Sequence, residues 1–269
     1  MKSAVELVIS IIQLGAIDYA TGLRLQQRLV DLRKEDRIGN VLLLLEHPPV
    51  ITLGRNAKRN NILASPEVLR QRGVEVYECD RGGDVTFHGP GQIVGYPIFD
   101  LRGFTAANGM RKTLGAIEYV RRLEEILIRT CADFAIPAKR ICGLTGVWTI
   151  PNGNQEEESK IAAIGVHISR SVTSHGLALN VNIDLDYFNL IVPCGITSKA
   201  VTSMSRQLGR ELSLEQVAHS LSRNLGLIFE SQMLWLENLD ALLSHPVGVP
   251  LKRPDELRQM NKEEDTFWA

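Results

Sequence analysis

The sequence predicts an α+β fold: a single domain in which a mixed β-sheet is flanked by helices. The predicted strands outnumber the predicted helices, and they cluster in the middle of the chain instead of alternating with helices one for one. That pattern favours α+β over a doubly wound parallel sheet. The 269 residues can bury a large core without disulfides. We expect residues 1–230 to form one domain and residues 231–269, whose periodicity is weak, to form a C-terminal extension that is not an independent domain.

Two helices are predicted in the first third of the chain. Asp18 can cap a helix whose leucines recur at helical spacing, at Leu25, Leu29 and Leu32. Further on, Ser65-Pro66-Glu67 combines a capping residue, a first-turn proline and an acid, and Gly73 supplies a stop.

Two longer helices are predicted in the second half. One is expected from Asn108 to Ala135, because its apolar residues fall on one face and Pro137 ends it. That face includes Cys131, which is therefore predicted to lie in the core. The other begins at the capping box Ser213-Leu214-Glu215-Gln216.

The strands are predicted from short apolar runs and from alternation. Val41–Leu45 is a buried run that ends before two prolines, and Val74–Val76 alternates with polar residues. Further strands are expected at 93–99, 147–150, 161–168 and 177–183, and the last of these alternates strictly. The polar segment Pro151–Ser159 is predicted to be a hairpin loop.

Charge and hydropathy exclude several classes of protein. The 30 basic and 31 acidic residues give a net charge of −1, which argues against a nucleic-acid-binding protein. No apolar run approaches the roughly 20 residues that span a bilayer. Leu7–Ala16 is apolar, but it is interrupted and lacks a cleavage site, so a secretory signal is disfavoured. We expect a cytoplasmic protein with no membrane or nucleic-acid partner; an organellar matrix is the alternative.

The four cysteines are Cys79, Cys131, Cys142 and Cys194. None forms a C-x-x-C pair or lies at zinc-finger spacing from histidines, so neither a metal site nor a disulfide framework is predicted. The default for each is a small buried hydrophobe. Cys194 differs because Pro193 and Gly195 place it at a tight bend after an apolar run. That setting suits an accessible nucleophile, which must be weighed against the buried default.

The densest motif is Arg81–Gln92, with four glycines that let backbone approach a ligand. It matches neither the phosphate-loop nor the dinucleotide-binding pattern. Composition alone favours a glycine-rich hairpin over a site, although Arg81 and His88 point toward function. Taken by themselves, Lys160 is a lysine at a strand end and His175 a histidine in a turn.

Five segments together resemble the motif series of the lipoyl(octanoyl) transferases: 81–92, 145–148, 160–166, 173–180 and 191–196. The order and spacing match from about Leu14 to Leu225. Members of that family move an octanoyl group from acyl carrier protein to a lysine of lipoyl domains. The resemblance implies the α+β fold of lipoate ligases and of the catalytic domain of biotin protein ligases. It also implies that residues 1–230 are a catalytic domain, that catalysis proceeds through a cysteine thioester, and that no cofactor is needed.

The resemblance assigns roles residue by residue. Cys194 matches the acyl-accepting cysteine, and Lys160 matches the lysine that lowers its pKa. The substrate-binding segments correspond to Arg81, Gly82, Gly83, Asp84, Val85, Thr86, Phe87, His88, Ala163, Ile164, Gly165, His175, Gly176, Leu177 and Ala178. Pro151–Ser159 is longer than the usual hairpin before the lysine.

The implied partners are octanoyl-acyl carrier protein as donor and, as acceptors, the lipoyl domains of 2-oxoacid dehydrogenase E2 subunits and the glycine cleavage H protein. We expect a monomer. Basic residues could meet these acidic partners, although scattered solvated charge is the plainer interpretation of Arg55, Lys58, Arg59, Arg111 and Lys112.

Three rival functions stay open. An ATP-dependent lipoate or octanoate ligase would need no nucleophilic cysteine. A non-catalytic module would only bind lipoyl domains or acyl carriers. A cysteine hydrolase would pair Cys194 with His88 or His175 and use water as the acceptor.

Overall fold

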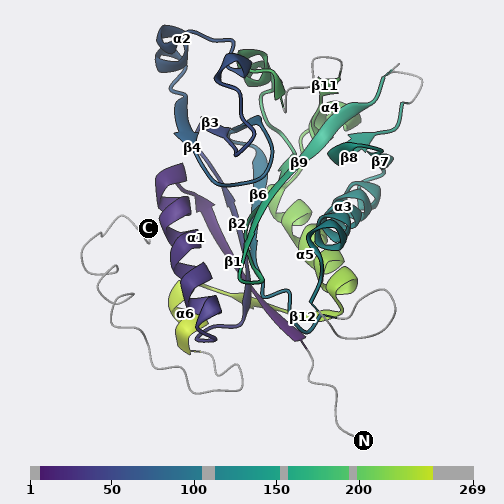
Figure 1. The fold of residues 1–269 in the computed structure, drawn as a ribbon. Helices are drawn as coiled ribbons and strands as arrows, with labels where there is room; N and C mark the ends of the chain where they lie inside the picture. The colour runs from purple at the N-terminus through teal and green to yellow at the C-terminus, as the bar shows by residue number, and fades with distance from the viewer. Residues whose placement is uncertain (1–6, 105–112, 152–156, 194–198, 245–269) are drawn as a thin grey trace, which may run out of the picture.

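The computed structural model describes residues 7–104, 113–151, 157–193 and 199–244, and it confirms the predicted fold class. A mixed sheet has the strand order β12-β1-β2-β6-β10-β9-β8-β7, with β11 paired to β9 (Figure 1). Its strands are β1 (Leu7–Ala16), β2 (Asn40–Glu46), β6 (Gln92–Ile98), β7 (Ala138–Ile141), β8 (Leu144–Thr149), β9 (Ser159–Ser169), β10 (Val172–Asn180), β11 (Ala200–Val201) and β12 (Ser231–Leu236). A second, three-stranded sheet consists of β4 (Glu75–Glu78), β3 (Val50–Leu53) and β5 (Val85–His88).

Helices cover both faces of the large sheet (Figure 1). One face packs against α3 (Ala116–Asp133) and α5 (Leu214–Phe229), and the other packs against α1 (Tyr19–Lys34) and α6 (Leu239–Ser244). The shorter helices are α2 (Pro66–Gln71), α4 (Met204–Leu208) and the 3₁₀ turns η1 (Arg59–Asn61) and η2 (Leu185–Leu190).

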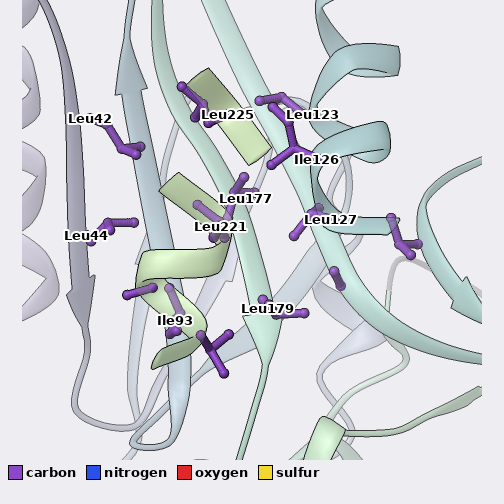
Figure 2. Packing of buried hydrophobic residues seen from close by; sticks show 14 of the residues in the cluster. Leu42, Leu44, Ile93, Leu123, Ile126, Leu127, Leu177, Leu179, Leu221 and Leu225 are labelled. Atoms are coloured by element: carbon purple, nitrogen blue, oxygen red, sulfur yellow. The ribbon is translucent and has the colours of Figure 1, made fainter. Parts of the chain in front are cut away.

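The core on the α3/α5 face is built from aliphatic side chains of strands and helices that are far apart in the sequence. Figure 2 shows β2, β6 and β10 meeting α3 and α5 through Leu42, Leu44, Ile93, Leu177, Leu179, Leu123, Ile126, Leu127, Leu221 and Leu225. This close packing positions the central strands against α3 and α5, and so also positions the residues on their other face.

The predicted helix starts hold where a side chain caps the helix. The side chain of Asp18 accepts a hydrogen bond from the backbone N–H of Thr21, and that of Ser213 accepts one from Gln216. The long helix α3 begins at Ala116 rather than at Asn108. Gly115 precedes it with an extended backbone, and residues 105–112 lie outside the described residues.

Two further expectations need correction. The strictly alternating strand 177–183 ends at Asn180, because the chain turns so that Ile183 joins a third core cluster under the small sheet. Cys142 is exposed rather than buried, whereas Cys131 is fully buried and its burial raises the pKa of its thiol to about 12.

Both ends of the described chain contribute strands to the large sheet. The segment Leu7–Ala16, which the sequence analysis weighed only as a secretory signal, is β1 and pairs in parallel with both β2 and β12. Residues 231–244, predicted to belong to an extension, supply edge strand β12 and helix α6. Leu236, Leu239 and Leu242 are buried in the core on the α1 face. The domain boundary at residue 230 stays a prediction, and residues 245–269 lie outside the described residues.

Within the described ranges, no helix is long and apolar enough to cross a membrane.

Candidate active site

A pocket lies where the 81–84 loop and β5 meet the middle of β9 and β10. Its walls include most residues of the segments singled out from the sequence: Arg81, Gly82, Gly83, Asp84, Thr86, His88, Ala163, Ile164, Gly165, His175, Gly176, Leu177 and Ala178. The pocket therefore brings together three segments that are up to 97 positions apart (178 − 81). Val85 and Phe87 do not line it. They alternate with Thr86 and His88 along β5, so they are buried in the core cluster under the small sheet.

Glycines let the 81–84 loop lie directly on β9. The backbone N–H of Gly82 donates to the carbonyl of Val166 at 3.0 Å. A Cβ atom on Gly165 would lie 2.7 Å from the carbonyl oxygen of Gly82, so no larger residue fits there without moving the loop.

Arg81 is buried, and its guanidinium holds the loop together. It donates to the hydroxyl of Thr52 at 3.1 and 2.9 Å, to the carbonyl of Thr52 at 2.7 Å, to that of Asp84 at 2.7 Å and to that of Gly82 at 3.1 Å. All of these acceptors are uncharged oxygens. Arg81 therefore positions the pocket wall and also brings a positive charge to it.

Asp84 holds the same loop against η1. Its carboxylate accepts hydrogen bonds from the backbone N–H of Lys58 at 3.1 Å and of Val85 at 2.7 Å, and from the side-chain amide of Asn61 at 2.6 Å. The carboxylate of Asp84 is thus occupied by backbone and amide donors.

A chain of buried hydrogen bonds sets the proton position on His88. The Nδ2 atom of Asn180 donates to the carbonyl of Thr202 at 2.9 Å, so Oδ1 of Asn180 must face Nε2 of Gln92, also at 2.9 Å. That Nε2 atom also donates to the carbonyl of Phe87, so Oε1 of Gln92 faces Nδ1 of His88 at 2.7 Å. Because Oε1 can only accept, Nδ1 carries the proton and Nε2 is left with a lone pair.

Burial keeps His88 neutral. Desolvation, reinforced by the nearby His47, lowers the pKa of His88 to about 3. The ring of Tyr19 stacks on it with a centroid separation of 6.3 Å.

Three wall residues were missed by sequence reasoning: Tyr19, Val94 and Tyr96. Tyr96 is tied to His47, whose Nδ1 lies 2.7 Å from the carbonyl of Ile17 and whose Nε2 lies 2.7 Å from the Tyr96 hydroxyl. A carbonyl cannot donate, so Nδ1 is protonated and Tyr96 donates to Nε2. Desolvation lowers the pKa of His47 to about 4. Tyr96 lies in a Gly-Tyr-Pro triplet of β6, a local signal that could have marked it.

His175 lines the far side of the pocket. Its Nε2 atom lies 2.7 Å from a carboxylate oxygen of Asp80, and its backbone N–H donates to the side chain of Gln26 at 2.7 Å. Desolvation lowers the pKa of His175 despite the opposing effect of Asp80, because the ring is buried. All three histidines of the pocket region are therefore neutral near pH 7.

Lys160 is buried at the start of β9, three residues before Ala163, and its side chain is not part of the pocket wall. Its ammonium group lies 5.2 Å from the centroid of the Trp148 ring, within cation–π range. Val201 of β11 pairs with Lys160, and the backbone N–H of Thr202 donates to its carbonyl at 2.9 Å. Cys194, the predicted nucleophile, lies outside the described residues.

The described residues hold no group of three or more His, Cys, Asp or Glu side chains arranged for a metal ion. The pocket combines small apolar wall residues, neutral hydrogen-bond acceptors, the guanidinium of Arg81 and the carboxylate of Asp84, which is held by donors of its own. Such a wall suits an apolar group with a polar carbonyl end.

Comparison with known proteins gives a consistent match. The family model of the lipoyl protein ligase A/B catalytic domain matches residues 18–226. Among solved structures, a bipartite lipoate protein ligase from Thermoplasma acidophilum is similar in fold, with a TM-score of 0.65 at 15% identity over 86% of this chain and 87% of that chain. A lipoate-protein ligase A bound with ATP has a TM-score of 0.61 at 12% identity, over 87% and 89% of the two chains.

Curated relatives are more similar in sequence. An octanoyltransferase of Koribacter versatilis is 59% identical over 257 residues, which are 96% of this chain and 98% of the relative. One from Acidobacterium capsulatum is 59% identical over 239 residues, 88% of this chain and 96% of the relative. The fold and the matching family model define a catalytic domain of the lipoyl protein ligase A/B class. Within that class, the chain belongs to the octanoyltransferases, a family of acyltransferases.

Proposed function

We propose that this enzyme transfers an octanoyl group, or a lipoyl group, from acyl carrier protein to a lysine of lipoyl domains, through a thioester on Cys194. The observation that supports this most is the burial of Lys160 beside β11, on the strand that also forms the pocket wall. Lysine side chains are seldom buried unless they are paired, and a cysteine thiolate is the kind of group that a lysine cation stabilises.

In the first step, the thiolate of Cys194 attacks the carbonyl carbon of the donor thioester. The bond from that carbon to the carrier's sulfur breaks, and the carrier leaves as a thiol after taking up a proton. One thioester replaces another, so the step needs no ATP. Lys160 acts either as a cation that stabilises the thiolate or as a neutral amine that removes the thiol proton.

In the second step, the ε-amino group of a lipoyl-domain lysine attacks the acyl-enzyme. A C–N bond forms, the C–S bond breaks, and the proton lost from nitrogen restores the thiol of Cys194 or the ammonium of Lys160. The product amide is more stable than the thioester, which drives the reaction forward.

The pocket offers a place for the acyl chain. Ala163, Ala178 and Val94 line it with small apolar side chains. Each methylene that moves from water into such a site contributes about 0.8 kcal/mol. Ile164 and Leu177 also line the pocket, but they pack mainly into the core on the α3/α5 face.

The structure weighs against the rival hydrolase. A cysteine hydrolase needs a histidine that takes up a proton near neutral pH. Burial holds the pKa of His88 at about 3, so His88 is not suited to that role; burial also lowers the pKa of His175, whose Nε2 atom is already held by Asp80. A ligase would need ATP, and a binding module would need no reactive cysteine; both make separate predictions in the experiment below.

The testing experiment measures intact-protein mass after mixing with octanoyl-acyl carrier protein without ATP, for the wild type and for Cys194→Ala. We expect an octanoyl-sized increase in the wild type alone, and its loss when a lipoyl domain is added. Transfer only when free octanoate and ATP are supplied in place of the thioester donor would indicate the ligase. If neither an adduct nor transfer is observed, the non-catalytic binding module is the remaining interpretation.

The acceptors included in this proposal are E2 lipoyl domains and the glycine cleavage H protein. The chemistry needs a reduced thiol, so we place the enzyme in the cytoplasm. We propose that it acts as a monomer.

A further inference from the structure

We propose that His88 orients the acceptor lysine: its Nε2 atom accepts a hydrogen bond from the ε-amino group while that group attacks the acyl-enzyme. This inference rests on the proposed function and names the residue that prepares its second step. It also makes Gln92 and Asn180 positioning residues, because they determine which nitrogen of His88 can accept.

The series of hydrogen bonds leaves His88 with one free position, the acceptor atom Nε2. It starts at a backbone carbonyl, that of Thr202, which can only accept, so every amide along it has one possible orientation. Nδ1 of His88 is committed as a donor to Gln92. Among the described residues, none is hydrogen-bonded to Nε2, and His88 lines the pocket. Nε2 is therefore an acceptor that is available to a group entering the pocket.

The position of this series of hydrogen bonds places His88 toward the Lys160 end of the site. The residue at the start of the chain, Thr202, also donates its backbone N–H to the carbonyl of Lys160. Tyr96, whose hydroxyl oxygen is another acceptor in the wall, is four residues beyond Gln92 on β6. Its hydroxyl is held by His47, whose ring centroid also lies 6.0 Å from that of His88.

The reacting groups explain which partner needs such an acceptor. The donor thioester has only acceptor atoms at its reacting carbon. The attacking amine has two N–H groups, of which one proton is lost and the other stays in the product amide. In a site that excludes water, the retained N–H needs an acceptor, or its desolvation opposes the attack. Nε2 of His88 supplies that acceptor and aims the nitrogen lone pair at the acyl carbon.

The low pKa of His88 indicates that His88 orients the amine by a hydrogen bond and does not remove its proton. An imidazole whose pKa is about 3 does not keep a proton near pH 7. The proton lost from the amine therefore goes to the departing sulfur of Cys194 or to Lys160, as in the proposed second step. His88 stays neutral throughout and acts by hydrogen bonding alone.

The test separates the two steps by rapid mixing, with the acyl-enzyme followed by intact-protein mass. The variants are His88→Asn, which keeps a donor toward Gln92 but loses the acceptor at Nε2, and His88→Gln, whose longer side chain can restore an acceptor there. His219→Gln serves as the matched control, because His219 is exposed on α5 and outside the pocket wall.

We expect His88→Asn to be acylated within about threefold of the wild-type rate and to transfer to the lipoyl domain about 10- to 100-fold more slowly, the range for one lost hydrogen bond and one unpaired N–H. His88→Gln should recover most of the transfer rate, and His219→Gln should match the wild type in both steps. Retained acylation shows that the Asn variant is folded.

An equal loss in both steps, an unchanged transfer rate in His88→Asn, or no recovery in His88→Gln would overturn the role of His88. If His88→Asn does not fold, Gln92→Leu takes its place: it removes the acceptor that holds the Nδ1 proton, and we again expect slower transfer with acylation retained. A transfer rate in Gln92→Leu equal to that of the wild type would also overturn the inference. The absence of any octanoyl adduct on the wild type would instead contradict the proposed function.

Discussion

Gly146 and Lys160 are packed against each other across β8 and β9: a Cβ atom on Gly146 would lie 2.8 Å from Cε of Lys160. The backbone N–H of Gly146 donates at 3.1 Å to Glu124, a buried carboxylate of α3 that also binds Arg121 and Arg140. Strand β8, which confines the Lys160 side chain, is thus anchored to α3 through Glu124. The space for the Lys160 side chain is set by the absence of a side chain at position 146.

Gly146→Ala should therefore displace Lys160 and slow acylation. The added methyl also meets the carbonyl of Ala162 at 2.7 Å, and the backbone φ of 118° disfavours alanine, so the melting temperature should fall as well. The acylation rate is measured below the melting point of the variant. Gly115→Ala is the control, since a Cβ there meets nothing within 4 Å. A folded Gly146→Ala protein with wild-type acylation would show that this confinement of Lys160 is unimportant.

Lys160→Ala should slow acylation and move its pH optimum upward. Without the neighbouring amine, the thiol of Cys194 should titrate nearer the usual cysteine pKa of about 8.5, so less thiolate is present at pH 7. The check is the acylation rate between pH 6 and pH 10 for both proteins. Superimposable pH–rate profiles would contradict the pairing of Lys160 with Cys194.

Arg81→Lys should loosen the 81–84 loop although the charge is kept. A lysine ammonium cannot reach both Thr52 and the carbonyl of Asp84 in the way that the flat guanidinium does. We expect a loss of about 2 kcal/mol in the free energy of unfolding, because hydrogen bonds to charged donors are each worth about that much. Amide exchange of residues 52–58 should quicken. Unchanged exchange would show that Arg81 is not what holds the loop.

Ala163→Leu should make the enzyme discriminate against long acyl chains. Ala163 is half-buried in the pocket wall and outside the core clusters, and the free volume of the whole pocket is about 50 Å³. A larger side chain there should exclude roughly four methylenes, which at about 0.8 kcal/mol each is about two-hundredfold in acylation by the octanoyl donor. A butyryl donor should be affected far less. Equal losses for both donors would place the acyl chain elsewhere.

The free energy of unfolding should fall as the pH drops below 6.5. The folded protein holds His47 and His88 neutral down to about pH 4 and pH 3, whereas both take up protons in the unfolded chain near pH 6.5. The free energy of unfolding is unaffected by these two histidines above pH 6.5. Below pH 6.5 each histidine lowers it by up to about 1.4 kcal/mol per pH unit. Urea unfolding at pH 7.5, 6 and 5 measures this slope. His47→Asn should show a shallower slope, and an unchanged slope would contradict the assignment.

Local signals in the sequence were sufficient for the helix starts that a side chain caps. Asp18 and Ser213 cap their helices through side chains that bond within three residues, so neighbouring residues carry all the information needed. The start of α3 was misplaced because no side chain caps it. Leu7–Ala16 was not predicted as a strand, since its mostly apolar run shows no strict alternation, as is common where both faces of a sheet are covered.

The residues of the pocket could be chosen only through the resemblance to a family, because spacing does not reveal that positions 81, 163 and 176 converge. Gln92 and Asn180 were not singled out as site residues. Each looks like an ordinary polar residue of a strand, and its importance comes from a partner more than 80 positions away. Long-range pairing of this kind is a property of the fold and leaves no local pattern.

The pairing of β1 with β12 also constrains how the protein is made. Leu7 is paired with Ser231, a separation of 231 − 7 = 224 residues. During synthesis, one edge of β1 stays open until nearly the whole described chain has left the ribosome, at about 5 to 20 residues per second. Such distant contacts close late and slow the folding of the chain. Chains truncated before residue 231 should therefore expose a long apolar strand edge and be prone to aggregate.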